Sequence, residues 1–369
     1  MKSQDLQFVK RIKPEMKKEI EKNYQKLLNQ RKLQRAKKEL KITNALNELN
    51  KLSKPIIGKN ELKLYEHLYS KHKIECENER IKYLGNGSDN SKIVSKHKSA
   101  FSRELEKNIP GLKKLLQKRK QLVSKYLNEE KKPGPSPSGG IVKGILAGRF
   151  EIFEKAIFLD PTAINNKPPY TFIENRIDIV FDEFNTLDYD SIADVDSGLI
   201  IHNIKTYHVD NAWFTHKAAK YEAYAGFGVN YTMPKTGTVS VDVFIQNLYN
   251  KNLVSITDNF GASEGWADLE NKLYMNILHP SNIAPFEIEL NKMDLHSDGD
   301  EVIRNDINKI DTEFAKWINF RSTGSFVEGT NLQIIVGNKE MFYNILDDMQ
   351  CSSETLYSWF VRNIIVRTV

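Results

Sequence analysis

The sequence predicts an α+β fold in two segregated domains, an N-terminal elongated helical hairpin or three-helix bundle and then an all-β, jelly-roll-like sandwich. Apolar residues recur every three or four positions before residue 130, as in helices, and at nearly every second position after residue 140, as in strands. All four tryptophans lie in the second part. We therefore expect a helical domain over residues 1–130, a linker over 131–140 and a β-sandwich domain over 141–369.

The boundary lies in the segment EEKKPGPSPSGG, residues 129–140, which has three prolines, three glycines and no apolar side chain to bury. Charge divides at the same place. Residues 1–132 carry 35 Lys or Arg against 16 Asp or Glu, a net +19, whereas residues 133–369 carry 19 against 32, a net −13. This asymmetry favours contact between the two parts, within one chain or between chains.

The first helix is expected from Pro14 to about Lys54, because this stretch has no further proline and no glycine. Its apolar residues form one narrow stripe, which we expect to pack on other helices. A second helix should follow KPIIGKNE, residues 54–61. A third should follow the turn GNGSDN, residues 85–90, and break at Pro110.

About ten strands are expected after residue 140, each rich in Val, Ile, Phe and Tyr and bounded by Gly, Pro, Asn or Asp. The alternation is clearest in KTGTVSVDVFIQ, which predicts a strand with one buried face made of Val239, Val241, Val243 and Ile245. Only the segment from Asp306 to Trp317 suggests a helix in this half.

Several functional classes lack their sequence signals. Cys76 and Cys351 make no disulfide framework, and there is neither a signal-peptide core nor a run of roughly 18 apolar residues. We expect synthesis in the cytoplasm, with any exit through a dedicated export system, by lysis or within a particle. Because P-loop, dinucleotide-binding and C-x-x-C motifs are missing, we expect a non-enzymatic protein without a cofactor.

A basic cluster in LKKLLQKRK is the clearest candidate docking surface of the helical half. Its positive charge suits a polyanion, an anionic membrane or an acidic protein surface, including the second half of the same chain. Lysine predominates over arginine and no base-reading motif occurs, which argues against sequence-specific recognition of nucleic acid. The cluster consists of Lys113, Lys114, Lys118, Arg119 and Lys120.

An acidic loop, NKMDLHSDGDEV, is a candidate calcium site. Calcium prefers several carboxylate oxygens, and the glycine within the loop permits a sharp turn. The loop departs from an EF-hand, because position twelve would be Asn305 rather than glutamate. The candidate ligands are Asp294, Asp298, Asp300 and Glu301.

A second candidate metal site starts from His208 and Asp210, whose side chains share one face of a strand. With a distant histidine, either His279 or His296, they form a two-histidine, one-carboxylate set. This set resembles that of the iron and 2-oxoglutarate oxygenases, whose core is also a jelly roll. The resemblance covers three residues and implies an Fe(II) site. It departs from the family in the co-substrate arginine, expected about ten residues after the distal histidine, because Arg304 follows His296 by eight.

Four aromatic residues are candidates for ligand binding on the sandwich, by stacking on sugar rings or anchoring a protein partner. The alternative is that they fill the core, and the sequence leaves both open. They are Trp213, Tyr221, Tyr224 and Trp359.

These features favour a non-enzymatic assembly or target-binding protein. Its basic helical arm would serve oligomerisation or docking, and its sandwich would present a surface to a protein or glycan, with self-association expected. One alternative is a toxin-like protein with a membrane-active helical half and a target-binding sandwich. Two others are a jelly-roll capsid subunit with a basic arm facing nucleic acid, and the iron oxygenase.

Overall fold

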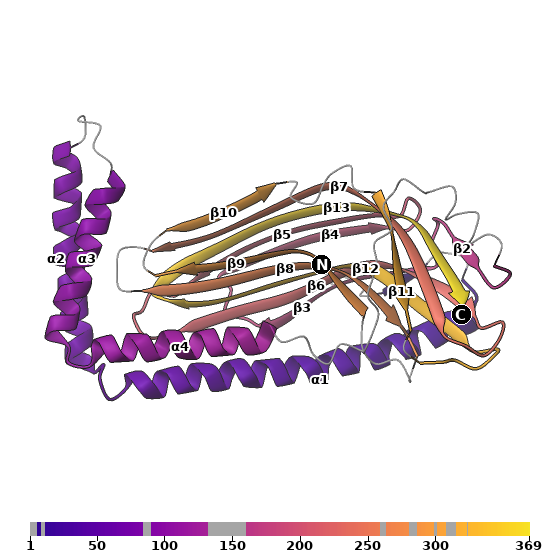
Figure 1. Cartoon of the computed structure of the whole chain (residues 1–369), viewed down its shortest axis with the longest axis horizontal. Helices are drawn as coiled ribbons and strands as arrows, with labels where there is room; N and C mark the ends of the chain where they lie inside the picture. The colour runs from indigo at the N-terminus through magenta and orange to yellow at the C-terminus, as the bar shows by residue number, and fades with distance from the viewer. Residues whose placement is uncertain are drawn as a thin grey trace.

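Four helices precede two antiparallel β-sheets that form a sandwich (Figure 1). The computed structural model describes residues 6–8, 12–83, 90–131, 160–258, 263–279, 286–298, 301–307, 315–322 and 324–369. The helices are α1 (Pro14–Ser53), α2 (Lys59–Tyr83), α3 (Asn90–Asn108) and α4 (Leu112–Lys131). The predicted fold class is confirmed.

The two sheets are named A and B. In spatial order, sheet A contains β1 (Leu6–Phe8), β3 (Phe172–Phe181), β6 (Lys217–Thr232), β12 (Asn331–Asp347), β8 (Glu264–Ile277) and β9 (Phe286–Ser297). Sheet B contains β10 (Val302–Ile307), β7 (Val239–Asp258), β13 (Met349–Thr368), β5 (Leu199–Val209) and β4 (Thr186–Asp194). Strand β2 (Ile164–Asn166) pairs with β13, and β11 (Ala315–Arg321) pairs with β7. The chain crosses repeatedly between the sheets, as in jelly-roll folds.

The main core lies between the inner faces of the two sheets. The four residues predicted to share a buried face of one strand do so on β7, where they pack with Phe227 of β6 and Trp359 of β13. The alternation in the sequence therefore located this core correctly. The four β7 residues are Val239, Val241, Val243 and Ile245.

A second apolar layer covers the outer face of sheet A. Helix α1 is 40 residues long, roughly 60 Å at the usual rise, and it runs along the sandwich beside α4 (Figure 1). Towards its start, Ile20 and Tyr24 pack with Phe172 and Tyr274. Further along, α1 and α4 pack on the same sheet through Ile42, Leu49, Val123, Trp266 and Tyr343.

The apolar stripe of α1 thus lies against a sheet, and the expectation that it packs on other helices is wrong in this respect. The reason is that sheet A carries apolar and aromatic side chains on both faces, so that its outer face needs cover as well.

Helices α2 and α3 form an antiparallel hairpin that projects from one end of the sandwich (Figure 1). Its base is anchored where the ring of Tyr65 stacks on that of Trp213, with centroids 4.1 Å apart, and where the Tyr65 hydroxyl donates to Asp348. The break predicted at Pro110 is present between α3 and α4, and Gly111 adopts a φ of +88° there. The Tyr65 contacts attach the base of the hairpin to the sandwich.

A helix was suggested over Asp306 to Trp317, but the described ends of this segment belong to β10 and β11, and residues 308–314 lie outside the described residues. The linker expected over residues 131–140 lies outside the described residues from position 132 onward, so the domain boundaries stay a prediction. Within the described residues, none of the helices contains a stretch apolar and long enough to span a membrane.

Candidate functional site

Buried charges join α1 to the outer face of sheet A. Glu174 of β3 is fully buried and accepts hydrogen bonds from the hydroxyls of Tyr24 and Tyr274, at 3.0 and 2.6 Å. Arg31 of α1 donates to the same carboxylate at 2.5 Å, and its guanidinium lies 3.9 Å from the ring centroid of Tyr224. Two donors come from the helix and one from the sheet, so the buried carboxylate is satisfied only when α1 is docked.

A second charged contact lies one β-strand further on. Lys38 of α1 donates to Glu222 of β6, whose other carboxylate oxygen lies 3.6 Å from the ammonium of Lys339. Burial alone would raise the pKa of Glu222, but the ammonium groups of Lys339 and Lys38 hold that pKa well below its ordinary value. The carboxylate is thus charged and paired with cations from the helix and from β12.

The third contact belongs to Arg119 of α4, which is 2% exposed. Its guanidinium binds Glu264 of β8 at 3.1 Å and Asp347 at the end of β12. The backbone N–H of Phe214 donates to Asp347 as well. Burial raises the pKa of Glu264 to about 7 and also raises that of Asp347, despite the nearby cation. One guanidinium therefore compensates two carboxylates that are costly to bury.

These contacts show where the basic cluster predicted on α4 lies. Arg119 and Lys120 contact the acidic sandwich of the same chain, Lys120 through Asp298 at 2.8 Å. Lys113, Lys114 and Lys118 are exposed. Docking on a polyanion or a membrane through these three stays a prediction.

The four aromatic candidates are all buried, from 0% to 5% exposed, so none offers a stacking surface. Trp213 anchors the hairpin, and Tyr224 lies under Arg31 of α1. Tyr221 and Trp359 fill the space between the sheets. Of the two interpretations that the sequence left open, the structure supports the core.

The structure does not bring the predicted iron ligands together. His208 is fully buried and its Nδ1 lies 2.5 Å from the Asn344 side-chain oxygen, while Asp210 accepts from Thr215 at 2.6 Å in the following turn. His296 belongs to β9 and lies on the outer face of sheet A, the face that α1 and α4 cover, where its ring stacks on that of Trp266. The geometry therefore offers no facial triad of these three residues.

The predicted calcium ligands are also spread out. Asp294 is exposed on β9 with Lys292 at 4.0 Å, whereas Asp298 is bound by Lys120. Glu301 is exposed, and Asp300 lies outside the described residues. The structure groups Asp298 instead with His296 and Glu264, where Arg119 and Lys120 already supply positive charge.

The hairpin contains a cluster that the sequence reasoning missed. His72 and Glu75 of α2 lie near His97 of α3, with candidate ligand atoms within 4.8 Å of one another. The spacing H-x-x-E places two of them on one helix face and was readable from the sequence. The third residue, His97, joins them only through the register of α2 against α3, which could not be read from the sequence.

The outer face of sheet B is the large surface that no described helix covers (Figure 1). Strand pairing sets its outward side chains in five rows across β7, β13, β5 and β4, and three of these rows extend to β10. Apolar residues at its margins, Ile303 at 57% and Ile192 at 49% exposed, flank a charged centre. The two central rows are Asn305, Leu253, Glu354, Lys205 and Asp188, then Ile307, Lys251, Leu356, Asn203 and Asp190.

Charges of both signs meet at the centre of this face. Glu354 lies 2.9 Å from the ammonium of Lys251 and 3.6 Å from that of Lys205. Beside them is an open depression of about 360 Å³ lined by residues that include Asp188, Asp190 and Asn203. Such groups can donate and accept hydrogen bonds on a partner, and the partly exposed apolar residues around them can bury area against it.

Comparisons with known proteins give weak similarities. No family model and no curated protein matches the sequence. Among solved structures, the enzymatically active domain of bacteriophage CBA120 tailspike protein 4 has 8% identity and a TM-score of 0.14, covering 58% of this chain and 20% of its own. The chain thus spans about a fifth of that domain's length.

Two carbohydrate-binding modules are similar at the same low level. The CBM22-1 xylan-binding domain of Paenibacillus barcinonensis Xyn10C has 12% identity and a TM-score of 0.13, with 48% of this chain and 83% of that one covered. TmCBM61, solved with beta-1,4-galactotriose, has 11% identity and a TM-score of 0.11, with 46% and 89% covered. Scores this low establish neither a shared fold nor a shared ligand.

Proposed function

We propose that the protein is a non-enzymatic assembly protein that self-associates through the outer face of sheet B. The proposal rests on one difference between the two sheets, which is whether helices of the same chain cover the outer face. The outer face of sheet A is occupied by α1 and α4 of the same chain, whereas that of sheet B presents partly exposed apolar residues around a charged centre.

The size of the face suits a stable interface. Strands about 4.8 Å apart and outward residues about 6.7 Å apart give the five rows an area of roughly 750 Å². A partner in a standard protein interface contributes about 800 Å². Since the centre carries both carboxylates and ammonium groups, a two-fold pairing of identical faces can place Lys205 or Lys251 against Asp188 or Asp190 of a second copy.

The test is the oligomeric state of the full chain, measured by sedimentation velocity over a concentration series. We expect wild-type protein to form dimers. The double variant Ile192→Lys, Ile303→Lys should have a dimer dissociation constant at least about tenfold higher, because two lysines would become buried in the interface. Both substitutions are at exposed positions, so the fold should be unaffected.

The matched control is Val327→Lys, which changes an apolar residue that is 68% exposed and lies outside sheet B. It should associate like the wild type. A wild-type chain that stays monomeric throughout the series, or a double variant that dimerises as tightly as the control, would contradict the proposal.

A further inference from the structure

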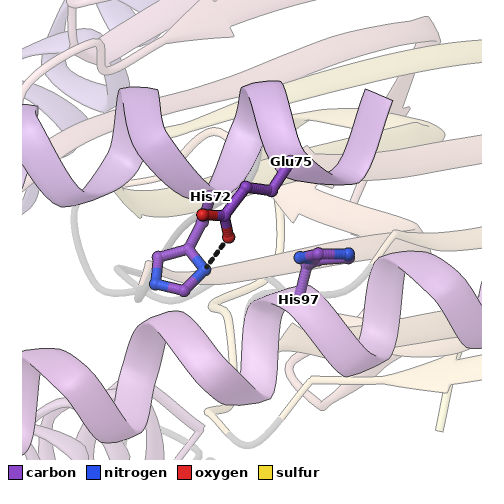
Figure 2. Close-up of side chains that lie close together, drawn as sticks. All are labelled: His72, Glu75 and His97. Carbon is purple, nitrogen blue, oxygen red and sulfur yellow. Dashed lines mark ion pairs between the residues drawn. The ribbon is translucent and has the colours of Figure 1, made fainter. Parts of the chain in front are cut away.

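The middle of the α2–α3 hairpin holds three metal-ligating side chains around one point. His72 and Glu75 lie one turn apart on α2, and His97 faces them from α3 (Figure 2). The two histidines are 5% and 8% exposed, whereas Glu75 is exposed. Each residue offers one ligand atom, and these atoms lie within 4.8 Å of one another.

Each histidine is braced from behind by a carboxylate of the opposite helix. Nε2 of His72 lies 2.8 Å from Glu104 of α3, and Nε2 of His97 lies 2.7 Å from Glu79 of α2. A neutral imidazole that donates from Nε2 has its lone pair on Nδ1. Carboxylates that hold the far nitrogen in this way fix the tautomer and ring orientation of metal-binding histidines.

Lysines hold the bracing carboxylates in turn. Lys71 lies 3.1 Å from Glu104, and Lys96 lies 2.8 Å from Glu79. The arrangement is thus repeated across the hairpin, with one lysine, one glutamate and one histidine on each side. Because these lysines already balance the charges of Glu79 and Glu104, the carboxylate of Glu75 would balance the positive charge of a bound cation.

The near nitrogen of His72 lacks a hydrogen bond. Its Nδ1 is buried, has no hydrogen-bond partner among the described residues, and lies 3.6 Å from Glu75, too far for a hydrogen bond (Figure 2, dashed line). A buried polar atom left in this state is costly. It points towards the same space as the Glu75 carboxylate, which is where a cation would satisfy both.

We propose that His72, Glu75 and His97 bind one zinc ion between α2 and α3. Two imidazoles and one carboxylate are ligands that zinc favours, whereas calcium and magnesium prefer oxygen alone. Ligand atoms about 2.0–2.2 Å from zinc lie roughly 3.4 Å apart in a tetrahedron. The exposed Glu75 side chain can close the remaining gap by a rotamer change, and water can take the fourth position. The ion would join the two helices and stabilise the hairpin, whichever partner the sandwich binds.

The test measures zinc binding to the chelator-treated full chain in two ways. Titration calorimetry gives the affinity and stoichiometry, and thermal unfolding with and without zinc gives the change in melting temperature. We expect one ion per chain and a higher melting temperature with zinc. Glu75→Gln should weaken binding at least about tenfold without loss of folding, because Glu75 is exposed. His97→Gln should remove the thermal shift, and Glu104→Gln should weaken binding about 10–100-fold through the lost brace.

Two controls locate the ion. Glu77→Gln changes an exposed glutamate of α2 whose partner is Arg80, and Asp298→Asn changes the second cluster near His296. Both should bind zinc like the wild type. Absence of binding with zinc in excess, unchanged affinity in Glu75→Gln and His97→Gln, or loss of binding in Asp298→Asn alone would each overturn the proposal.

Discussion

Replacing Arg119 with alanine is expected to lower the free energy of unfolding by about 3–5 kcal/mol, the usual cost of breaking a buried ion pair from one side. The substitution leaves Glu264 and Asp347 buried without their common cation, and the pKa of Glu264 is already raised to about 7 with the cation present. Urea denaturation followed by tryptophan fluorescence measures the loss.

The control for this experiment is Lys118→Ala, which removes an exposed cation one residue away and should change stability by less than about 0.5 kcal/mol. Adding Glu264→Gln and Asp347→Asn to Arg119→Met should restore part of the stability, because no buried charge is then left unpaired. A loss below about 1 kcal/mol in Arg119→Ala would show that α4 is not held on sheet A by this group.

Removing the helical half is expected to abolish folding of the sandwich. Residues 141–369 alone would expose the outer face of sheet A, including the rings of Phe172, Tyr274, Trp266 and Tyr343. Burying an apolar side chain contributes about 1.5–3 kcal/mol, so losing the cover of these four rings costs about 6–12 kcal/mol, comparable with the roughly 5–15 kcal/mol that stabilises a typical domain. We expect insoluble or uncooperatively unfolding protein, as measured by sizing chromatography and thermal unfolding.

A matched deletion distinguishes the effect of uncovering sheet A from the effect of shortening the chain. Replacing residues 70–100 by a short Gly-Ser turn removes much of the α2–α3 hairpin but leaves α1 and α4 on sheet A. This variant should stay soluble and unfold cooperatively. A fragment of residues 141–369 that unfolds as cooperatively as the full chain would show that the helices contribute little to the sandwich.

Local sequence signals predicted most of the secondary structure. Pro14 begins α1, Pro110 separates α3 from α4, and alternation located the buried face of β7. The two ends of the segment from Asp306 to Trp317 were misread as helical, since pairing with β7 places residues 306–307 in β10 and residues 315–317 in β11. The partner of the α1 stripe was missed although β6 carries apolar residues on both faces, which is typical of a sheet covered on both sides.

The candidate sites depended more on tertiary structure. Arg119 lies between two exposed lysines, but its spacing of three or four residues from Leu116 and Val123 places it on the apolar face of α4, a signal that the sequence offered. Its partners Glu264 and Asp347 come from distant strands, and no local pattern contains them. Likewise, burial of Trp213 and Trp359 depends on what covers them, because aromatic residues serve cores and binding surfaces equally well. The rows of side chains on sheet B could be identified only from the register between strands, which no local sequence pattern contains.

The basic helices dock on the sandwich of their own chain. Zero-length carbodiimide cross-linking tests this docking directly, because it joins only amines and carboxylates in contact, such as Lys120 with Asp298 and Lys38 with Glu222. Equal amounts of unlabelled and ¹⁵N-labelled chains are mixed, unfolded and refolded together before cross-linking and mass spectrometry. We expect these cross-linked peptides to be wholly light or wholly heavy. Pairs of one light and one heavy peptide at these positions would show docking between chains and contradict the account.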